Sequence, residues 1–181
     1  MPWGELTLDQ FVAPKCSKLT ACHAPELPEP YNHFANFFLN NVLVRSYPDK
    51  WRWAAIVFLR RLANAMQAYR DGREQMRRCV EAPNGSDGMI WAYLSSLSHF
   101  ESAIVSAYLA LMAHQAVNNL IPPEKTKESS FESGENTAEE RLNKAYNALK
   151  HFHGNLECGK IQNTTPIWLV DDGIECAGSE G

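Results

Sequence analysis

Signatures of the common catalytic and nucleotide-binding classes are missing from this sequence. It contains no GxGxxG, Walker A, HExxH or GxSxG motif, and no paired ExxH sequences. Such motifs supply the phosphate-cradling glycines, metal ligands or nucleophiles that their enzyme classes need. A ferritin-like di-iron site, which uses two ExxH sequences, is excluded on the same ground. The sequence therefore predicts no cofactor and no metal centre.

Cysteine is also scarce and irregularly spaced. The five cysteines are an odd number, and no CxxC pair occurs among them. A zinc site built from Cys16, Cys22 and His23 would lack a fourth ligand and fits no zinc spacing. Reduced thiols in a cytoplasmic protein are the simpler interpretation. The first ten residues, MPWGELTLDQ, lack a basic region followed by an apolar run, so we expect no signal peptide.

Charge is nearly absent from residues 89–120, MIWAYLSSLSHFESAIVSAYLALMAHQAVNNL. The one formal charge there is Glu101, and the stretch has no proline or glycine. A helical period places large residues on one side and alanines and serines on the other, which predicts a long helix packed on both sides. A neighbouring backbone could approach closely on the small side. Interrupting histidines and serines, and the missing basic flank, argue against a membrane span.

Glu101 falls within the large-residue side of this predicted helix. A lone carboxylate in such a place is costly unless it is paired or protonated. We therefore expect a basic partner from another helix, either Arg60 or Arg61, so that the pair fixes the helix register. Two alternatives remain open: the carboxylate forms the floor of a polar site, or the helix is rotated so that Glu101 is exposed.

Local signals around this stretch predict the rest of the architecture. The turn Pro83–Gly88 is short, which makes the flanking helices antiparallel neighbours. Thr137 and Glu140 form a capping-box sequence at a helix start. The sequence predicts an all-α, up-down bundle of four long helices, at about 31–45, 50–81, 89–120 and 138–153, with a small C-terminal β-hairpin at about 167–176. The chain then divides into an irregular N-terminal arm (1–30), the helical bundle (31–154) and a hairpin tail (155–181).

The helix predicted at 50–81 is basic, although the whole chain has a net charge of -4. It holds eight basic and three acidic residues, and four arginines share one side of the helical wheel: Arg52, Arg70, Arg73 and Arg77. Such a stripe could follow phosphates, or it could be a solvated face laced with local ion pairs. Gly72 weakens the helix and predicts a bend there.

The segment RLNKAYNALKHF of the last predicted helix resembles the terminal helix of HEPN-type domains. The shared pieces are Asn147, Lys150 and His151, with Arg141 preceding them. HEPN-type domains are compact helical bundles of prokaryotic defence, toxin and RNA-processing proteins. The resemblance implies a bacterial protein that pairs as a homodimer through its final helices, with a polar groove at the dimer seam.

One departure from the family pattern bears on catalysis. Ribonuclease members carry an arginine a few residues before the histidine, where His would be acid or base and Arg would hold the phosphate. Arg141 lies too far from His151 for this, so we expect a non-catalytic protein that binds a partner protein or RNA. The predicted binding residues are Arg61, Glu101, Asn147, Lys150 and His151. The alternatives are a ribonuclease or nucleotide-transferring toxin component using His151 with an arginine, and a structural subunit of a larger assembly.

Overall fold

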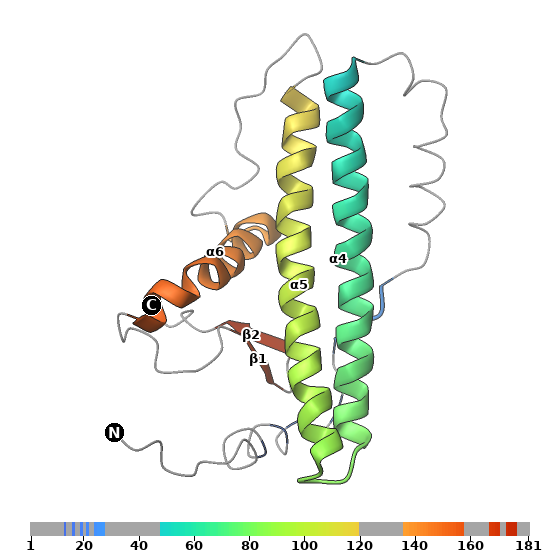
Figure 1. Cartoon of the computed structure of the whole chain (residues 1–181), viewed down its shortest axis with the longest axis vertical. Helices are drawn as coiled ribbons and strands as arrows, with labels where there is room; N and C mark the ends of the chain where they lie inside the picture. The colour runs from blue at the N-terminus through green and yellow to red at the C-terminus, as the bar shows by residue number, and fades with distance from the viewer. Residues whose placement is uncertain are drawn as a thin grey trace. The chain divides into compact units, whose positions relative to one another are not determined.

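The chain forms three helices and one pair of strands in the part that the structure describes. The computed structural model describes residues 13, 16, 19, 21, 24–27, 48–119, 136–157, 167–170 and 173–176. The helices are α4 (Asp49–Glu81), α5 (Asp87–Asn119) and α6 (Ala138–Glu157) (Figure 1). The strands β1 (Ile167–Val170) and β2 (Gly173–Cys176) pair antiparallel, with Ile167 opposite Cys176 and Val170 opposite Gly173.

The predicted turn between α4 and α5 is confirmed. The Ser86 backbone N–H donates to the Pro83 carbonyl at 3.0 Å, and Gly85 adopts a φ of 74°, which a residue with a side chain rarely adopts. The Ser86 hydroxyl then accepts a hydrogen bond from the Met89 N–H at 3.2 Å. Because this serine caps the helix, α5 begins two residues earlier than position 89, where the apolar run starts.

The predicted cap of α6 is also confirmed. The Glu140 N–H donates to the Thr137 hydroxyl at 3.1 Å, while the Glu140 carboxylate accepts the Asn136 N–H at 2.5 Å. Glu140 thus reaches back one residue beyond the cap itself. At the other end α6 continues through Gly154 to Glu157 instead of stopping at 153. A single glycine inside a helix costs only about 1 kcal/mol, so it weakens a helix without ending it.

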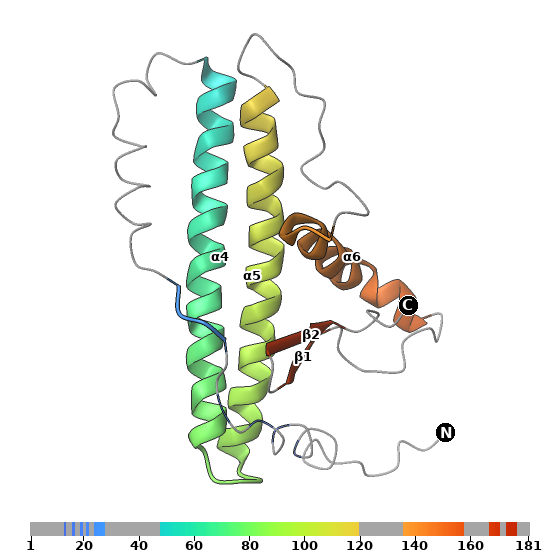
Figure 2. The same ribbon diagram turned by 180° about the vertical axis from the view of Figure 1, so that it is seen from behind.

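Residue contacts divide the chain into two compact units. The first comprises 1–26, 68–101 and 151–181, and the second comprises 27–67 and 102–150. Each unit contains a segment of α4 and a segment of α5. Within each unit these two helix segments pack against each other (Figure 2). Each unit therefore has its own packing between α4 and α5.

The first unit is built on a close approach of α4 and α5 at Gly72. The Ser96 hydroxyl on α5 donates to the Gly72 carbonyl at 2.7 Å. A Cβ placed on Gly72 would lie 3.2 Å from the His99 Cβ and 3.3 Å from the ring of the buried Phe100. The largest fully buried side chains of this unit are Tyr93, Phe100, Met76, Ile90, Cys79 and Ser96. The helix is continuous through Gly72, where the missing side chain gives α5 room to pack.

The second unit packs through small and aromatic residues. Trp51 and Ala55 of α4 form a buried cluster with Val117 of α5. Phe58 lies against His114, with ring centroids 5.4 Å apart. Tyr146 of α6 stacks on Tyr108 of α5, with centroids 3.7 Å apart and ring planes 6° from parallel. This stacking packs α6 against α5 within the second unit.

The predicted up-down bundle of four helices is wrong. Residues 48–119 and 136–157 contain three helices, and the helix expected at 31–45 lies outside the described residues. The error comes from treating α5 as a helix enclosed on both sides. Its small side is buried, at positions such as Ala92, Ala103 and Ala110, but Ile104 and Leu111 on the large side are only half-buried. Thus α5 is not a rod surrounded by three others in the part of the chain described.

The helices of the described ranges also lack membrane character. None of them combines the length with the sustained apolar composition that a span across a bilayer needs. For α5 this agrees with the expectation drawn from its serines and histidines.

Candidate functional site

The five predicted binding residues are spread over three helices. Arg61 on α4 and Glu101 on α5 are half-buried, whereas Asn147, Lys150 and His151 on α6 are exposed. Arg61, Asn147 and Lys150 belong to the second compact unit, and Glu101 and His151 to the first. The five residues are thus divided between the two units, and their roles in binding remain predictions.

Glu101 lacks the predicted arginine partner. Burial raises the pKa of its carboxyl group above the usual range. No ion pair to Glu101 is formed by any described basic residue, and the candidates Arg60 and Arg61 are exposed and half-buried. Glu101 is therefore a partly desolvated acid whose ionised form is disfavoured by its surroundings.

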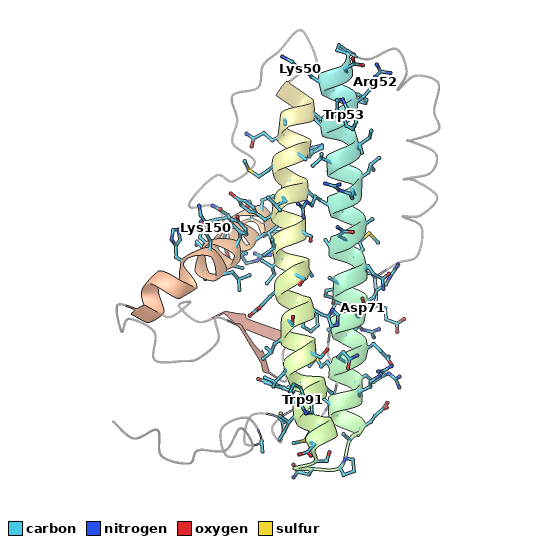
Figure 3. All side chains as sticks on the ribbon, in the orientation of Figure 1. Lys50, Arg52, Trp53, Asp71, Trp91 and Lys150 are labelled. Atoms are coloured by element: carbon cyan, nitrogen blue, oxygen red, sulfur yellow. The ribbon has the colours of Figure 1, made fainter. Side chains whose placement is uncertain are left out.

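The polar side of α6 is an exposed surface. Asn147 donates its side-chain amide to the Asn143 side chain at 3.1 Å, one helical turn earlier. Lys144 pairs with the Glu140 carboxylate at 3.0 Å. Lys150, labelled in Figure 3, is exposed and forms no ion pair with a described acid. Asn147 and His151 are one turn apart on this surface, as expected from their spacing. The surface therefore offers exposed hydrogen-bonding groups.

Arg141 has a structural role at the start of α6. Its guanidinium donates to the Asn136 carbonyl at 2.7 Å, and Asn136 has a positive φ of 52°. The arginine thus stabilises the turn that leads into the helix. Almost three helical turns separate Arg141 from His151 along α6, because each turn takes about 3.6 residues. The two side chains do not form the Arg–His pair that a HEPN ribonuclease uses.

Most of the arginines in the predicted basic stripe are paired with acids. Arg52 contacts Asp49, and Arg73 pairs with Glu26 at 3.0 Å. Arg77 pairs with Glu74 at 2.9 Å and with Glu81 at 2.8 Å, and Arg78 shares Glu74 at 3.1 Å. Of the two interpretations left open by the sequence, the ion pairs favour a solvated face over a phosphate-binding stripe.

The first turns of α4 expose large apolar side chains. Trp53 is 67% exposed, Ile56 41% and Val57 36%. Their spacing of three and four residues places them on one side of α4, with the exposed Lys50 and Arg60 about one turn before and after them. Figure 3 labels Lys50 and Trp53 near the start of the helix. We call Lys50, Trp53, Ile56, Val57 and Arg60 the α4 face. This face was not predicted from the sequence, although Trp53, Ile56 and Val57 have the three- and four-residue spacing of one helix side.

Residues 24–26 of the N-terminal segment are hydrogen-bonded to α4, and this contact was not predicted from the sequence. The Tyr69 hydroxyl donates to the Pro25 carbonyl at 2.9 Å, and the Arg73 Nε donates to the Ala24 carbonyl at 2.5 Å. Arg73 adds its ion pair with Glu26. Because two of these acceptors are backbone carbonyls, any residue type could supply them, and no sequence signal marks them. From here on, N-terminal arm refers to the described residues of the predicted arm (1–30) that belong to the first unit, namely 13, 16, 19, 21 and 24–26.

A pair of cysteines lies where the N-terminal arm meets α4. Cys16 and Cys79 are each 2% exposed, and their side chains are joined by a hydrogen bond. That hydrogen bond, together with burial, raises the pKa of the Cys16 thiol, and the same bond lowers the pKa of the Cys79 thiol.

The comparisons with known proteins leave the family open. No protein-family model, curated protein or solved structure matches the chain. Within the described residues, no group of three or more His, Cys, Asp or Glu side chains is placed to hold a metal ion. The exposed α4 face and the polar side of α6 are therefore the surfaces on which a function can be proposed.

Proposed function

We propose that this chain is a non-catalytic, HEPN-like helical protein that acts through protein–protein contact, first of all with a second copy of itself. In this proposal it is a bacterial cytoplasmic protein in a defence or toxin–antitoxin setting. The observation that supports the proposal is the exposed α4 face. Monomeric proteins seldom leave a tryptophan and two aliphatic residues exposed side by side, and such patches are typical of interaction surfaces.

The α4 face is complementary to itself. If two copies of α4 lie antiparallel about a two-fold axis between Ile56 and Val57, each Ile56 faces the Val57 of the other copy. In the same register Trp53 faces Arg60, where a guanidinium over an indole ring is a favourable cation–π contact. Lys50 faces Ala63, so neither of the charged residues of the α4 face opposes a like charge. A homodimer built in this way buries the apolar residues and pairs the arginine.

Three other residues, which were candidates for catalysis, argue against a catalytic function. His151 is exposed, Arg141 is engaged at the start of α6, and Glu101 has no described basic partner. General acid–base chemistry needs a positioned group within reach of a second catalytic group. None of these three residues has one among the described side chains.

The test is the oligomeric state of the full chain at increasing concentration, measured by sedimentation equilibrium. We expect a dimer for the wild type and a monomer for Val57→Glu, because the two-fold axis would place the new carboxylates close together beside Ile56. Trp53→Ala should weaken the dimer by at least about tenfold in Kd, since a tryptophan at the centre of an interface often contributes about 2 kcal/mol.

The chain offers a matched control on α5. Trp91 is 66% exposed and lies outside the α4 face, so Trp91→Ala should leave the dimer unchanged. A wild-type protein that stays monomeric at about 100 µM, well above a Kd typical of specific dimers, would refute the proposal. A dimer that is lost in Lys150→Glu but kept in Val57→Glu would move the interface to α6, where the HEPN resemblance expects it.

A further inference from the structure

The two buried cysteines of the first unit come from segments far apart in the sequence. Cys16 belongs to the N-terminal arm and Cys79 to the last turn of α4, and both lie in the same compact unit. A hydrogen bond between their side chains holds the two sulfur atoms in contact. A disulfide needs sulfur atoms about 2.05 Å apart and Cβ atoms about 3.8 Å apart, so two buried thiols that share a hydrogen bond are candidates to form one.

We propose that Cys16 and Cys79 form a disulfide-forming redox site that takes a small-molecule disulfide, such as oxidised glutathione, as its oxidant. The bond would attach the N-terminal arm covalently to the end of α4. This inference goes beyond the proposed function, because it concerns the first compact unit and not the α4 face.

The reaction proceeds by two thiol–disulfide exchanges. The thiolate of Cys79 attacks one sulfur of oxidised glutathione, which breaks the S–S bond, forms a mixed disulfide and releases one glutathione thiolate. The thiol of Cys16 then gives up its proton, and its thiolate attacks the Cys79 sulfur and expels the second glutathione. Two protein thiols are oxidised by two electrons, one glutathione disulfide is reduced, and the two protons end on the two released glutathiones.

The hydrogen bond with Cys16 lowers the pKa of the Cys79 thiol, which favours Cys79 as the attacking thiolate. Both thiols are almost fully buried, so the oxidant reaches them only when the surrounding structure opens locally. The contacts of Ala24 and Glu26 with Arg73 then bring Cys16 back to Cys79, which favours the internal disulfide over a second glutathione adduct.

The experiment maps disulfides in the native full chain. The protein is incubated with oxidised glutathione without denaturant, quenched in acid, alkylated and digested with trypsin. Cleavage after Lys15 and Lys18 isolates Cys16 from Cys22, and cleavage after Arg78 isolates Cys79. Mass spectrometry should find the peptide beginning at Cys16 linked to the peptide beginning at Cys79, with a mass lower by two hydrogens than the sum of the two.

Three variants test the assignment. Cys16→Ser and Cys79→Ser should lose the linked peptide, and the remaining cysteine should accumulate a glutathione adduct. The double variant Cys158→Ser, Cys176→Ser is the matched control and should form the link as the wild type does. The oxidised wild type should melt at a temperature roughly 5 to 15 °C higher than the reduced protein, a shift that dithiothreitol reverses.

Two results would overturn the proposal, and neither depends on how well the variants fold. One is a wild-type map in which Cys16 is linked to a cysteine other than Cys79. The other is a Cys16–Cys79 link that forms in urea but not in the native protein, because the folded arrangement would then not be its cause.

Discussion

Glu101 is the residue where sequence and structure differ most in their consequences. An acid on the large side of a nearly uncharged helix predicted a buried ion pair, and its loss would then destabilise the protein. The carboxyl is half-buried, burial raises its pKa, and none of the described basic residues pairs with it. A wheel can place a charge on a helix face, but it cannot determine whether a long arginine side chain on another helix reaches it.

Glu101→Gln should therefore stabilise the protein at neutral pH. Because the native pKa is raised above the unfolded value of about 4.3, the native state binds the proton more tightly, and ionised Glu101 lowers stability as pH rises. The neutral amide removes that cost, and the gain is small because solvent screens a half-exposed group. Urea unfolding at about pH 8 should show the gain, and it should vanish at about pH 3, below the unfolded pKa, where carboxyl and amide are both essentially uncharged. A loss of stability at pH 8 would instead indicate a partner that Glu101 needs.

Gly72 is a second residue whose role changed with the structure. The sequence suggested a bend, but the helix is continuous and the glycine lies where α5 packs most closely. A methyl group there would press on the His99 Cβ and on the ring of Phe100, which is 1% exposed and has no room to move.

Gly72→Ala should consequently destabilise the protein. Overpacking costs about 1–3 kcal/mol, which exceeds the gain of about 1 kcal/mol in helix propensity, so a net loss of about 1 kcal/mol is expected. Gly88→Ala is the matched control, because the nearest atom to its added Cβ is the Ser86 hydroxyl at 3.9 Å. Thermal melting should show a lower Tm for the first variant and an equal or higher Tm for the second. Equal behaviour of both would mean that α5 does not pack tightly on Gly72.

At the scale of elements, local signals predicted what they control. The turn at Pro83–Gly88 and the cap at Thr137 formed as expected, since turns and caps depend on residues a few positions apart. The attachment of the N-terminal arm depends instead on the carbonyls of Ala24 and Pro25, which have no residue-type signature. The same limit explains why the Cys16–Cys79 contact could not be predicted, since any two of five scattered cysteines could meet.

Arg73 should be the main anchor of the N-terminal arm. It donates to the Ala24 carbonyl and pairs with Glu26, and hydrogen bonds to charged groups contribute about 1.5–3 kcal/mol. In Arg73→Ala, hydrogen exchange in peptides covering residues 16–27 should become at least about tenfold faster, since each 1.4 kcal/mol of lost stability raises the open fraction tenfold.

Arg77→Ala is the control for the arm. Its partners Glu74 and Glu81 lie on α4 itself, so this variant should leave exchange in the arm unchanged. If both variants loosen the arm equally, α4 as a whole has become less stable and Arg73 has no special role.

At the scale of the whole molecule, the prediction of a four-helix bundle treated composition as evidence of enclosure. The low charge of α5 suggested a helix surrounded by three others. Both sides of its wheel contain buried residues, such as Ala103 and Ala110 on the small side and Leu97 on the large side, whereas Ile104 and Leu111 on the large side are half-buried. Side-chain size along a wheel therefore did not determine how completely each side of α5 is covered.

The charge of the whole chain disfavours binding to RNA. The net charge is -4, and Arg52, Arg73, Arg77 and Arg78 are neutralised by neighbouring acids. Binding to phosphates depends on cations that release counterions, and its strength falls steeply with salt. We expect no RNA binding tighter than about 100 µM at about 150 mM salt in a fluorescence-anisotropy titration with a generic single-stranded RNA.

The informative comparison is a second titration at about 50 mM salt, where counterion release favours nucleic-acid binding most. Arg60→Glu with Arg61→Glu is the matched variant, because no described acid is paired with either arginine. Tight binding with a steep salt slope that this variant abolishes would make α4 a phosphate-binding surface and would replace the protein-binding proposal. Cleavage of the RNA that is lost in His151→Ala would go further and restore the ribonuclease alternative. Weak binding that the variant leaves unchanged would show that Arg60 and Arg61 do not bind phosphate. Arg60 would then be available for the cation–π contact with Trp53 in the proposed antiparallel dimer.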